Sequence, residues 1–320
     1  MENNIQLTRP GLAPLDFYHN VWTRVRKCFF DQVTAAKLDD WEHSCDDEIR
    51  ITGDAVPSIR RMLAVLEDSY TCLADPKPED ATDPDQPEPL IETSTIGGSI
   101  AYVRVPSFGS NRVFREFEEA VRGLGDVAAY IIDLRGNTGG FLLNSCRVAA
   151  LFLADGLIQT YRNRDFDDGY FEASLKLTPE GFEESTTYES GKTDFETWGR
   201  FECIDKDKPV VLLINGGTAS TSELFAATLQ DHKRATVIGT ESYGKGIGQS
   251  EHMLENGYVL QLTDSHFLPP SGQFFGNAHQ GVRNPIVPDI LVELDEHTEG
   301  DAQLAAAIQA CSNRMTAAAR

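Results

Sequence analysis

Residues 209–223 read PVVLLINGGTASTSE, and this stretch contains the main clue to the fold of the chain. Its first six residues are apolar, which is typical of a short strand buried on both faces of a sheet. Two glycines follow, and the stretch ends like the start of a helix, with Ser220 at the N-cap and Glu223 three positions later. The stretch therefore predicts a buried strand, a tight turn and a helix, which is the unit of a parallel α/β sheet.

The same alternation of strands and helices continues on both sides of this stretch. The expected strands are residues 99–105, 128–134, 209–214, 235–239 and 258–264. The expected helices are residues 113–124, 142–153, 222–232 and 302–310. Residues 155–203 are polar and irregular, so we expect hairpins or an inserted loop there. The pattern predicts an α/β fold, with a core of parallel strand pairs.

The N-terminal part of the chain has a different pattern of apolar residues. Apolar residues recur at helical spacing from about Leu15 to Leu73, with a break and a new helix start at Pro57. Residues 76–90 are acidic and rich in proline, so they can bury little apolar surface. We therefore expect three parts. They are a small N-terminal helical domain at 1–75, a linker at 76–90 and the α/β core with its C-terminal helix at 91–320.

The composition excludes several classes of protein. The 320 residues carry a formal net charge of −22 at pH 7, and such a surface repels nucleic acid and anionic membranes. No segment approaches the ~20 apolar residues of a membrane helix, and the first residues lack the pattern of a signal peptide. We therefore expect a cytoplasmic protein with no nucleic-acid partner and no membrane segment. The cysteines and histidines show no metal-site spacing, so we expect neither metal nor cofactor.

A second glycine-rich stretch, GTESYGKGIGQ at 239–249, approaches two known motifs without completing either. As a phosphate-binding loop it fails because Gly246 stands where a serine or threonine must bind magnesium. As an S-x-x-K motif it fails because its glycines disfavour the helix that would place Ser242 and Lys245 one turn apart. A buried lysine can nevertheless lose its charge and serve a serine as general base. Lys245 is therefore a candidate base.

Ser220 is the candidate nucleophile that such a base requires. It is expected at a helix N-terminus, where backbone amides and the positive end of the helix dipole can stabilise an oxyanion. The small residues around it would let a substrate backbone approach closely. Alternatively, Ser220 or Ser222 is an ordinary helix cap, with Glu223 completing a capping box. The residues of this stretch alone leave both interpretations open.

Taken together, these motifs resemble those of the S41 family of serine peptidases, which comprises the C-terminal (tail-specific) processing proteases and their tricorn-core relatives. The elbow GTASTSE is followed, as in the family, by Leu-Gln-Asp231 and then by the YGKGIGQ turn. The separation of Ser220 and Lys245 along the chain is that of the family. The stretch DLRGNTGG at 133–140 resembles a further family block, as does the stretch from Leu268 to Asp289.

The resemblance implies a crotonase/ClpP-like α/β core and gives each matched residue a role. Ser220 would be the nucleophile, Lys245 the general base and Gln249 the residue that orients the lysine. The backbone amides of Gly140 and Thr221 would form the oxyanion hole. The supporting residues would be Gly139, Glu223 and Asp231. Such a site needs no metal and no cofactor.

The chain departs from the family pattern in one respect. Processing proteases usually carry a PDZ domain between the helical leader and the core, and residues 76–90 are too few to fold as one. The expected function is serine endopeptidase activity, the proteolytic processing of a protein or peptide substrate without a PDZ domain. A second copy of the chain or a dedicated partner would then present the substrate. The alternatives are a non-catalytic ligand- or peptide-binding protein on the same fold and an acyl-CoA enzyme of crotonase architecture.

Overall fold

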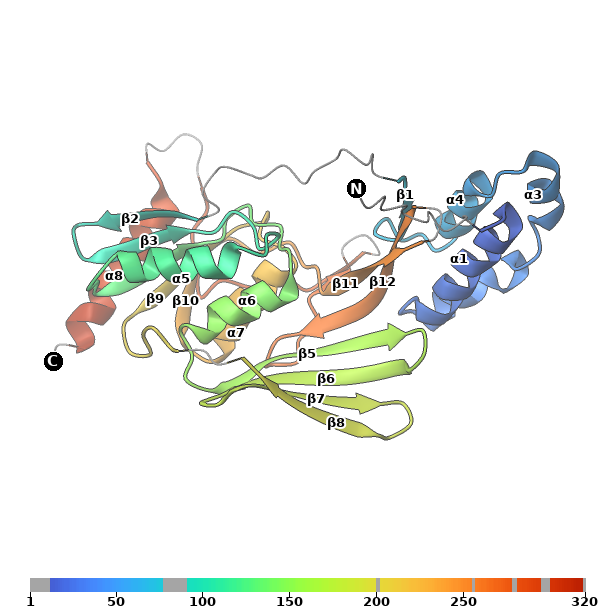
Figure 1. Ribbon diagram of the computed structural model, residues 1–320. Helices are drawn as coiled ribbons and strands as arrows, with labels where there is room; N and C mark the ends of the chain where they lie inside the picture. Colours follow the sequence, from blue (N-terminus) through green and yellow to red (C-terminus); the bar gives the residue numbers. More distant parts are fainter. Residues whose placement is uncertain are drawn as a thin grey trace, which may run out of the picture. The chain divides into compact units, whose positions relative to one another are not determined.

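The computed structural model describes residues 12–76, 91–199, 202–254, 257–277, 281–294 and 300–318 (Figure 1). The chain divides into two compact units. Residues 1–85, 163–171 and 248–265 form the first, which we call the N-terminal unit. Residues 86–162, 172–247 and 266–320 form the second, which we call the core unit. The segment expected to be a linker lies mostly outside the described residues.

The N-terminal unit begins with the expected helices. They are α1 (Pro14–Cys28), α2 (Gln32–Ala35), the 3-10 helix η1 (Ala36–Trp41), α3 (Asp46–Thr52) and α4 (Val56–Ala64). The predicted break is confirmed, because α3 ends at Gly53 in the left-handed conformation, with a φ of 69°. Pro57 then lies in the first turn of α4, where its missing N–H costs no hydrogen bond.

The expectation of helix up to Leu73 is wrong at its end. Residues Cys72–Ala74 form a strand, β1, which pairs antiparallel with β12 (Val259–Leu268), and Leu73 lies opposite Leu260. β11 (Ile247–Met253) pairs with β12 as well. The pairing partner lies far along the chain, so the local sequence could not reveal this strand.

The core unit contains a six-stranded sheet in the order β15-β10-β9-β4-β3-β2. Its strands are β2 (Glu92–Ile96), β3 (Ile100–Arg104), β4 (Ala129–Asp133), β9 (Val210–Ile214), β10 (Ala235–Gly239) and β15 (Ile290–Leu291). All neighbours pair parallel except β2 and β3. Every residue of β4 and β9 is buried, which explains their apolar sequences. The predicted parallel α/β core is confirmed.

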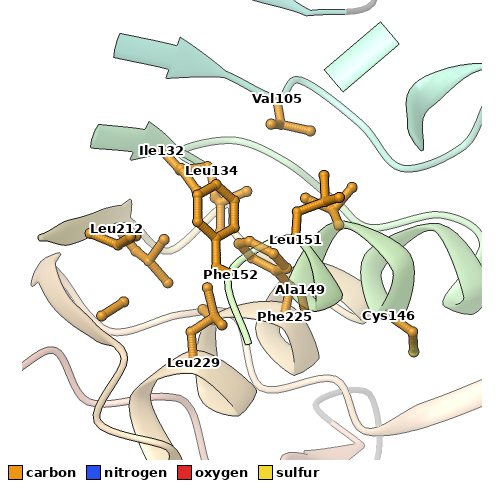
Figure 2. Close-up of a cluster of buried hydrophobic side chains, with 14 of the residues drawn as sticks. Val105, Ile132, Leu134, Cys146, Ala149, Leu151, Phe152, Leu212, Phe225 and Leu229 are labelled. Atoms are coloured by element: carbon orange, nitrogen blue, oxygen red, sulfur yellow. The ribbon is translucent and has the colours of Figure 1, made fainter. Parts of the chain in front are cut away.

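Helices cover both faces of this sheet. Three helices, α5 (Val113–Gly123), α6 (Leu142–Ala150) and α7 (Thr221–Asp231), share a hydrophobic cluster with one face. Figure 2 shows part of this cluster, in which Phe152 and Phe225 lie near Ile132 and Leu212. The opposite face packs on α8 (Ala302–Ala318) through a second cluster, which includes Ile131 and Leu213. Alternate residues of each strand therefore serve different layers.

The region expected to be hairpins or an inserted loop consists of long strands. They are β5 (Gly156–Asp165), β6 (Gly169–Thr178), β7 (Gly181–Tyr188) and β8 (Thr193–Trp198), hydrogen-bonded in that order. A short pair, β13 (Gly276–Asn277) and β14 (Val282–Arg283), follows β12. Across the described ranges, no helix combines the length and the apolar character needed to cross a membrane.

Candidate active site

Ser220 occupies a sharp turn between β9 and α7. Its φ of 59° and ψ of −125° are rare for a residue with a side chain, and such backbone strain costs of the order of 1–3 kcal/mol. The same kind of strained strand-to-helix turn presents the nucleophile in many hydrolases. Ser220 is 8% exposed, whereas Ser222, two residues on, is fully buried. Of these two candidate serines, Ser220 therefore keeps the greater exposure.

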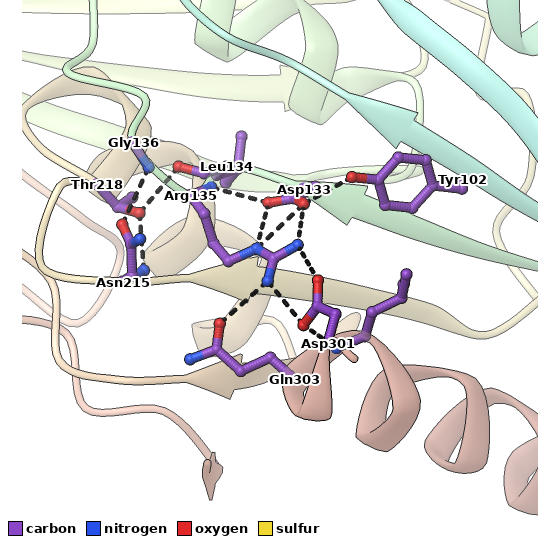
Figure 3. A network of polar contacts seen from close by, with 10 residues as sticks. Tyr102, Asp133, Leu134, Arg135, Gly136, Asn215, Thr218, Asp301 and Gln303 are labelled. Atoms are coloured by element: carbon purple, nitrogen blue, oxygen red, sulfur yellow. Dashed lines mark hydrogen bonds and ion pairs between the residues drawn. The ribbon is translucent and has the colours of Figure 1, made fainter. Parts of the chain in front are cut away.

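Hydrogen bonds between two loops hold this turn in place. Thr218 Oγ1 donates to the carbonyl of Leu134 over 2.9 Å and accepts from Asn215 N–H over 3.0 Å (Figure 3). Asn215 Oδ1 in turn accepts from Gly136 N–H and Gly217 N–H. The loops after β4 and β9 therefore meet at the carboxyl ends of adjacent parallel strands, the usual place for a site in an α/β sheet.

Two glycines allow the first loop to pack directly against Ser220. A Cβ atom on Gly139 would lie 2.8 Å from Ser220 Cβ and 3.1 Å from Thr221 N. A Cβ atom on Gly140 would lie 2.2 Å from the carbonyl carbon of Phe108. Both glycines also have positive φ angles, 102° and 147°. The backbone of this loop therefore approaches the start of α7 as closely as only glycine permits.

The amides of this region fall into two groups. Gly139 N–H donates to Asn137 Oδ1 over 2.9 Å, and Phe141 N–H donates to the carbonyl of Phe108 over 3.0 Å. Within the described part of the chain, no hydrogen bond uses the N–H of Gly140 or of Thr221. Thr221 is the first residue of α7, where amides have no partner inside the helix. These two amides can serve as donors to an anionic oxygen.

The buried carboxylate of Glu223 links Ser220 to the lysine turn. Its Oε2 accepts from Ser220 N–H and from Lys245 N–H, each over 2.8 Å. Its Oε1 accepts from Ser242 Oγ over 2.6 Å and from Gly244 N–H over 2.7 Å. The amide nitrogens of Ser220 and Lys245 therefore each lie 2.8 Å from the same oxygen atom, although the two residues are far apart in sequence.

Sequence reasoning predicted only part of this role. The half of the capping box in which Glu223 accepts from Ser220 N–H is present. The contacts with the lysine turn were missed, because any helix-capping glutamate looks the same in sequence. Burial raises the pKa of the Glu223 carboxyl, and the hydrogen bonds from Ser242, Lys245, Gly244 and Ser220 act in the opposite direction. Only the ionised carboxylate can accept from all four donors.

The turn around Lys245 needs its glycines, as expected. Gly244 has a φ of 90°, and a Cβ on Gly246 would lie 2.8 Å from the ring of Phe274. The chain then runs into the strand β11 and not into a helix, which agrees with the expectation that the glycines disfavour a helix. Lys245 itself is half-buried. Ser242 is fully buried, and its Oγ also accepts from Ile286 N–H over 2.7 Å.

Two other predicted site residues make the following contacts. Gln249 lies on β11 in the N-terminal unit, and its amide donates to Thr263 Oγ1 over 3.3 Å. Asp231 is the last residue of α7, at the opposite end of the helix from Ser220, and its Oδ2 accepts from Ser271 N–H over 2.9 Å. The residues that the structure brings together are Gly139, Gly140, Ser220, Thr221, Glu223 and Lys245.

The acidic residue of the DLRGNTGG block has a structural role. Asp133 is buried and accepts hydrogen bonds from Tyr102 Oη and from the Arg135 guanidinium (Figure 3). Arg135 also forms an ion pair of 2.8 Å with Asp301 and donates to Gln303 Oε1. This network connects the start of α8 to the loop that follows β4, and no local pattern in the sequence indicated it.

The parallel α/β core and the strained serine elbow are typical of hydrolases with a serine nucleophile. Residues 99–292 match the model of peptidase family S41, which is more than half of the chain. The chain therefore belongs to peptidase family S41.

Curated relatives are named as processing proteases. The carboxy-terminal-processing protease of Bartonella bacilliformis is 34% identical over 206 residues, which are 62% of this chain and 40% of that protein. The carboxyl-terminal-processing protease of Synechocystis sp. is 31% identical over 205 residues, 63% of this chain and 40% of that protein. The matched part thus spans two fifths of the length of these relatives.

Solved structures share the fold at low sequence identity. A photosystem II D1 C-terminal processing protease superposes with a TM-score of 0.63 at 16% identity, covering 88% of this chain and 94% of that one. A lipoprotein from Streptococcus agalactiae superposes with a TM-score of 0.65 at 13% identity, covering 95% and 97%. The predicted S41-like fold with a helical N-terminal region is confirmed.

Proposed function

We propose that this protein is a serine endopeptidase in which Ser220 is the nucleophile and Lys245 the general base. The observation that carries the proposal is the shared carboxylate oxygen of Glu223, to which the amides of Ser220 and Lys245 both donate over 2.8 Å. Membership of family S41 supplies the reaction class. The names of the relatives support a protein or peptide as the substrate.

In the first half of the reaction, neutral Lys245 takes the proton of Ser220 Oγ while that oxygen attacks a peptide carbonyl carbon. The carbonyl oxygen becomes an oxyanion and is held by the amides of Gly140 and Thr221. Each such donor lowers the barrier by about 3 kcal/mol. The strained backbone of Ser220 places this residue at the N-terminus of α7, where the helix dipole favours an oxyanion.

In the second half, protonated Lys245 gives its proton to the leaving amine, and the peptide bond breaks. Water, with its proton taken by the same lysine, then hydrolyses the acyl-enzyme and restores the Ser220 hydroxyl. We assign Gln249 the orientation of the lysine amine, as the family resemblance implies. The reaction requires no metal and no cofactor.

The proposal is tested with the full chain on an unstructured peptide library, with cleavage products read by mass spectrometry. We expect Ser220→Ala, Lys245→Ala and Lys245→Arg to abolish cleavage, the last because arginine stays protonated. A fluorophosphonate probe should label the wild type and not Ser220→Ala.

Ser222→Ala is the matched control, because Ser222 Oγ is buried and has no hydrogen-bond partner among the described residues. It should cleave and label as the wild type does. Undiminished cleavage by Ser220→Ala or Lys245→Ala would overturn the assignment. Absence of both labelling and cleavage in the wild type would instead favour a binding protein on this fold.

A further inference from the structure

Three side chains of types that bind metals converge among the helices of the N-terminal unit. His19 lies on α1, His43 lies in the turn after η1, and Asp46 is the first residue of α3. Each offers one ligand atom, and these atoms all lie within 4.8 Å of one another. His43 and Asp46 are only three residues apart along the chain, and the packing of α1 against this segment brings His19 to them.

The distances suit a single ion. His19 Nε2 lies 3.0 Å from Asp46 Oδ1, and His43 Nδ1 lies 3.3 Å from Asp46 Oδ2. The centroids of the two imidazole rings are 5.0 Å apart. Around a tetrahedral zinc ion with bonds of ~2.0–2.1 Å, neighbouring ligand atoms are roughly 3.3 Å apart. Small side-chain rotations would bring the three ligand atoms onto such a sphere.

The Asp46 carboxylate provides a second observation. Its Oδ1 is buried and, among the described residues, accepts no hydrogen bond, although His19 Nε2 lies only 3.0 Å away. In an ordinary ion pair the N–H would point at the oxygen. A short contact without hydrogen-bond geometry is what two ligands show when their lone pairs face a common point. A buried carboxylate oxygen without a donor is costly, and a cation would satisfy it.

We propose that His19, His43 and Asp46 bind a zinc ion. Two imidazole nitrogens and one carboxylate oxygen suit zinc, whereas magnesium and calcium prefer oxygen ligands alone. His43 Nε2 lies 3.8 Å from Glu42 Oε1, so a second carboxylate adds negative charge close to the cluster. The His43 side chain is 71% exposed, so the ion can enter from solvent and water can complete the coordination.

Arg50 competes for the same carboxylate, but only in part. Its guanidinium lies 3.4 Å from Asp46 Oδ2 and 2.8 Å from Asp47 Oδ1. It can remain on Asp47 while Asp46 turns toward the metal. A bound zinc ion would connect α1 to the start of α3, and so it would stabilise the helical part of the N-terminal unit without entering the chemistry of proteolysis.

The test is a zinc titration of the full chain after removal of metal with EDTA, with a chromophoric chelator as competitor. We expect Asp46→Asn and His43→Ala to bind one zinc equivalent fewer than the wild type, or to weaken one site at least tenfold. Asp40→Asn is the matched control, because it removes the same charge from an exposed position of the same unit and should bind zinc as the wild type does. The number of zinc equivalents that each variant loses distinguishes this site from zinc bound by cysteine thiols, because both variants keep all their cysteines.

Thermal unfolding gives an independent readout. Zinc should raise the melting temperature of the wild type and of Asp40→Asn but not that of Asp46→Asn. Without metal, His43→Ala should melt as the wild type does, because its side chain is mostly exposed. Equal zinc stoichiometry and affinity in Asp46→Asn and the wild type would overturn the proposal, and so would the absence of any zinc-dependent shift in the wild type.

Discussion

The backbone amides of Ser220 and Lys245 donate to the same atom, Oε2 of Glu223, each over 2.8 Å. One buried carboxylate therefore holds together two loops that are far apart in sequence. Its other oxygen holds Ser242 and Gly244 of the lysine turn. The relative position of the proposed nucleophile and base should depend on this one side chain.

Replacing Glu223 by glutamine should separate the two loops. In either orientation the NH2 group of the glutamine faces two of the four donors and cannot accept a hydrogen bond from them. Each buried N–H left without an acceptor costs about 1–3 kcal/mol. We expect the free energy of unfolding to fall by roughly 3 kcal/mol and kcat/KM to fall by about 100-fold or more.

Urea unfolding and peptide cleavage would measure these two effects. Glu241→Gln is the control, because Glu241 is an exposed carboxylate of the neighbouring turn and should change neither quantity. If Glu223→Gln cleaved peptides as fast as the wild type does, the shared carboxylate would not be required for activity.

Ser242→Ala distinguishes a structural hydroxyl from a nucleophile. The change removes a donor to Glu223 and leaves Ile286 N–H without its acceptor, at a cost of about 1–3 kcal/mol. We expect lower stability and slower cleavage, but continued labelling by a fluorophosphonate probe, which depends on Ser220. Loss of labelling in folded Ser242→Ala protein would contradict the structural role.

The two glycines beside Ser220 should not tolerate alanine. In Gly140→Ala the new Cβ would meet backbone atoms of Phe108 at 2.2 Å, so the loop and its proposed oxyanion donor must move. We expect cleavage to be undetectable and the melting temperature to drop. Gly136→Ala is the control. Gly136 also has a positive φ, 73°, but nothing lies within 4 Å of the added Cβ, so it should cost only about 1–2 kcal/mol. Equal activity of the two variants would refute the steric argument.

Asp264 should make the stability of the protein depend on pH. Burial raises the pKa of this carboxyl to about 6 from 3.8, and its Oδ1 has no hydrogen-bond partner among the described residues. A raised pKa means that the folded state binds the proton more tightly than the unfolded state does. The resulting stabilisation is complete below the ordinary pKa and is lost as the pH rises through about 6.

Asp264→Asn should therefore be more stable than the wild type above this pH, by up to roughly 3 kcal/mol, with little difference at pH 4. Urea unfolding of both proteins across this range gives the difference curve. Asp155→Asn, at an exposed position, should follow the wild-type curve. A stability difference between Asp264→Asn and the wild type that is the same at all pH values would show that the carboxyl does not titrate as argued.

Much of the core followed from local patterns. The apolar runs of β4 and β9 predicted buried strands, and the caps and glycines around Ser220 predicted the elbow. These features depend on residues within one turn or one strand, so a short stretch of sequence is enough to predict them. The strand β1 was missed, because its hydrogen bonds come from β12, far along the chain.

The sequence by itself determined the parallel α/β class, the serine elbow and the glycine turn around Lys245. Only the tertiary structure decided that Glu223 connects the two, that residues 163–171 and 248–265 join the N-terminal unit, and that His19 meets His43 and Asp46. The reason is physical. A helix cap or an apolar strand is specified by its neighbours in sequence, whereas a hydrogen bond between distant loops forms only after the whole sheet has positioned both ends.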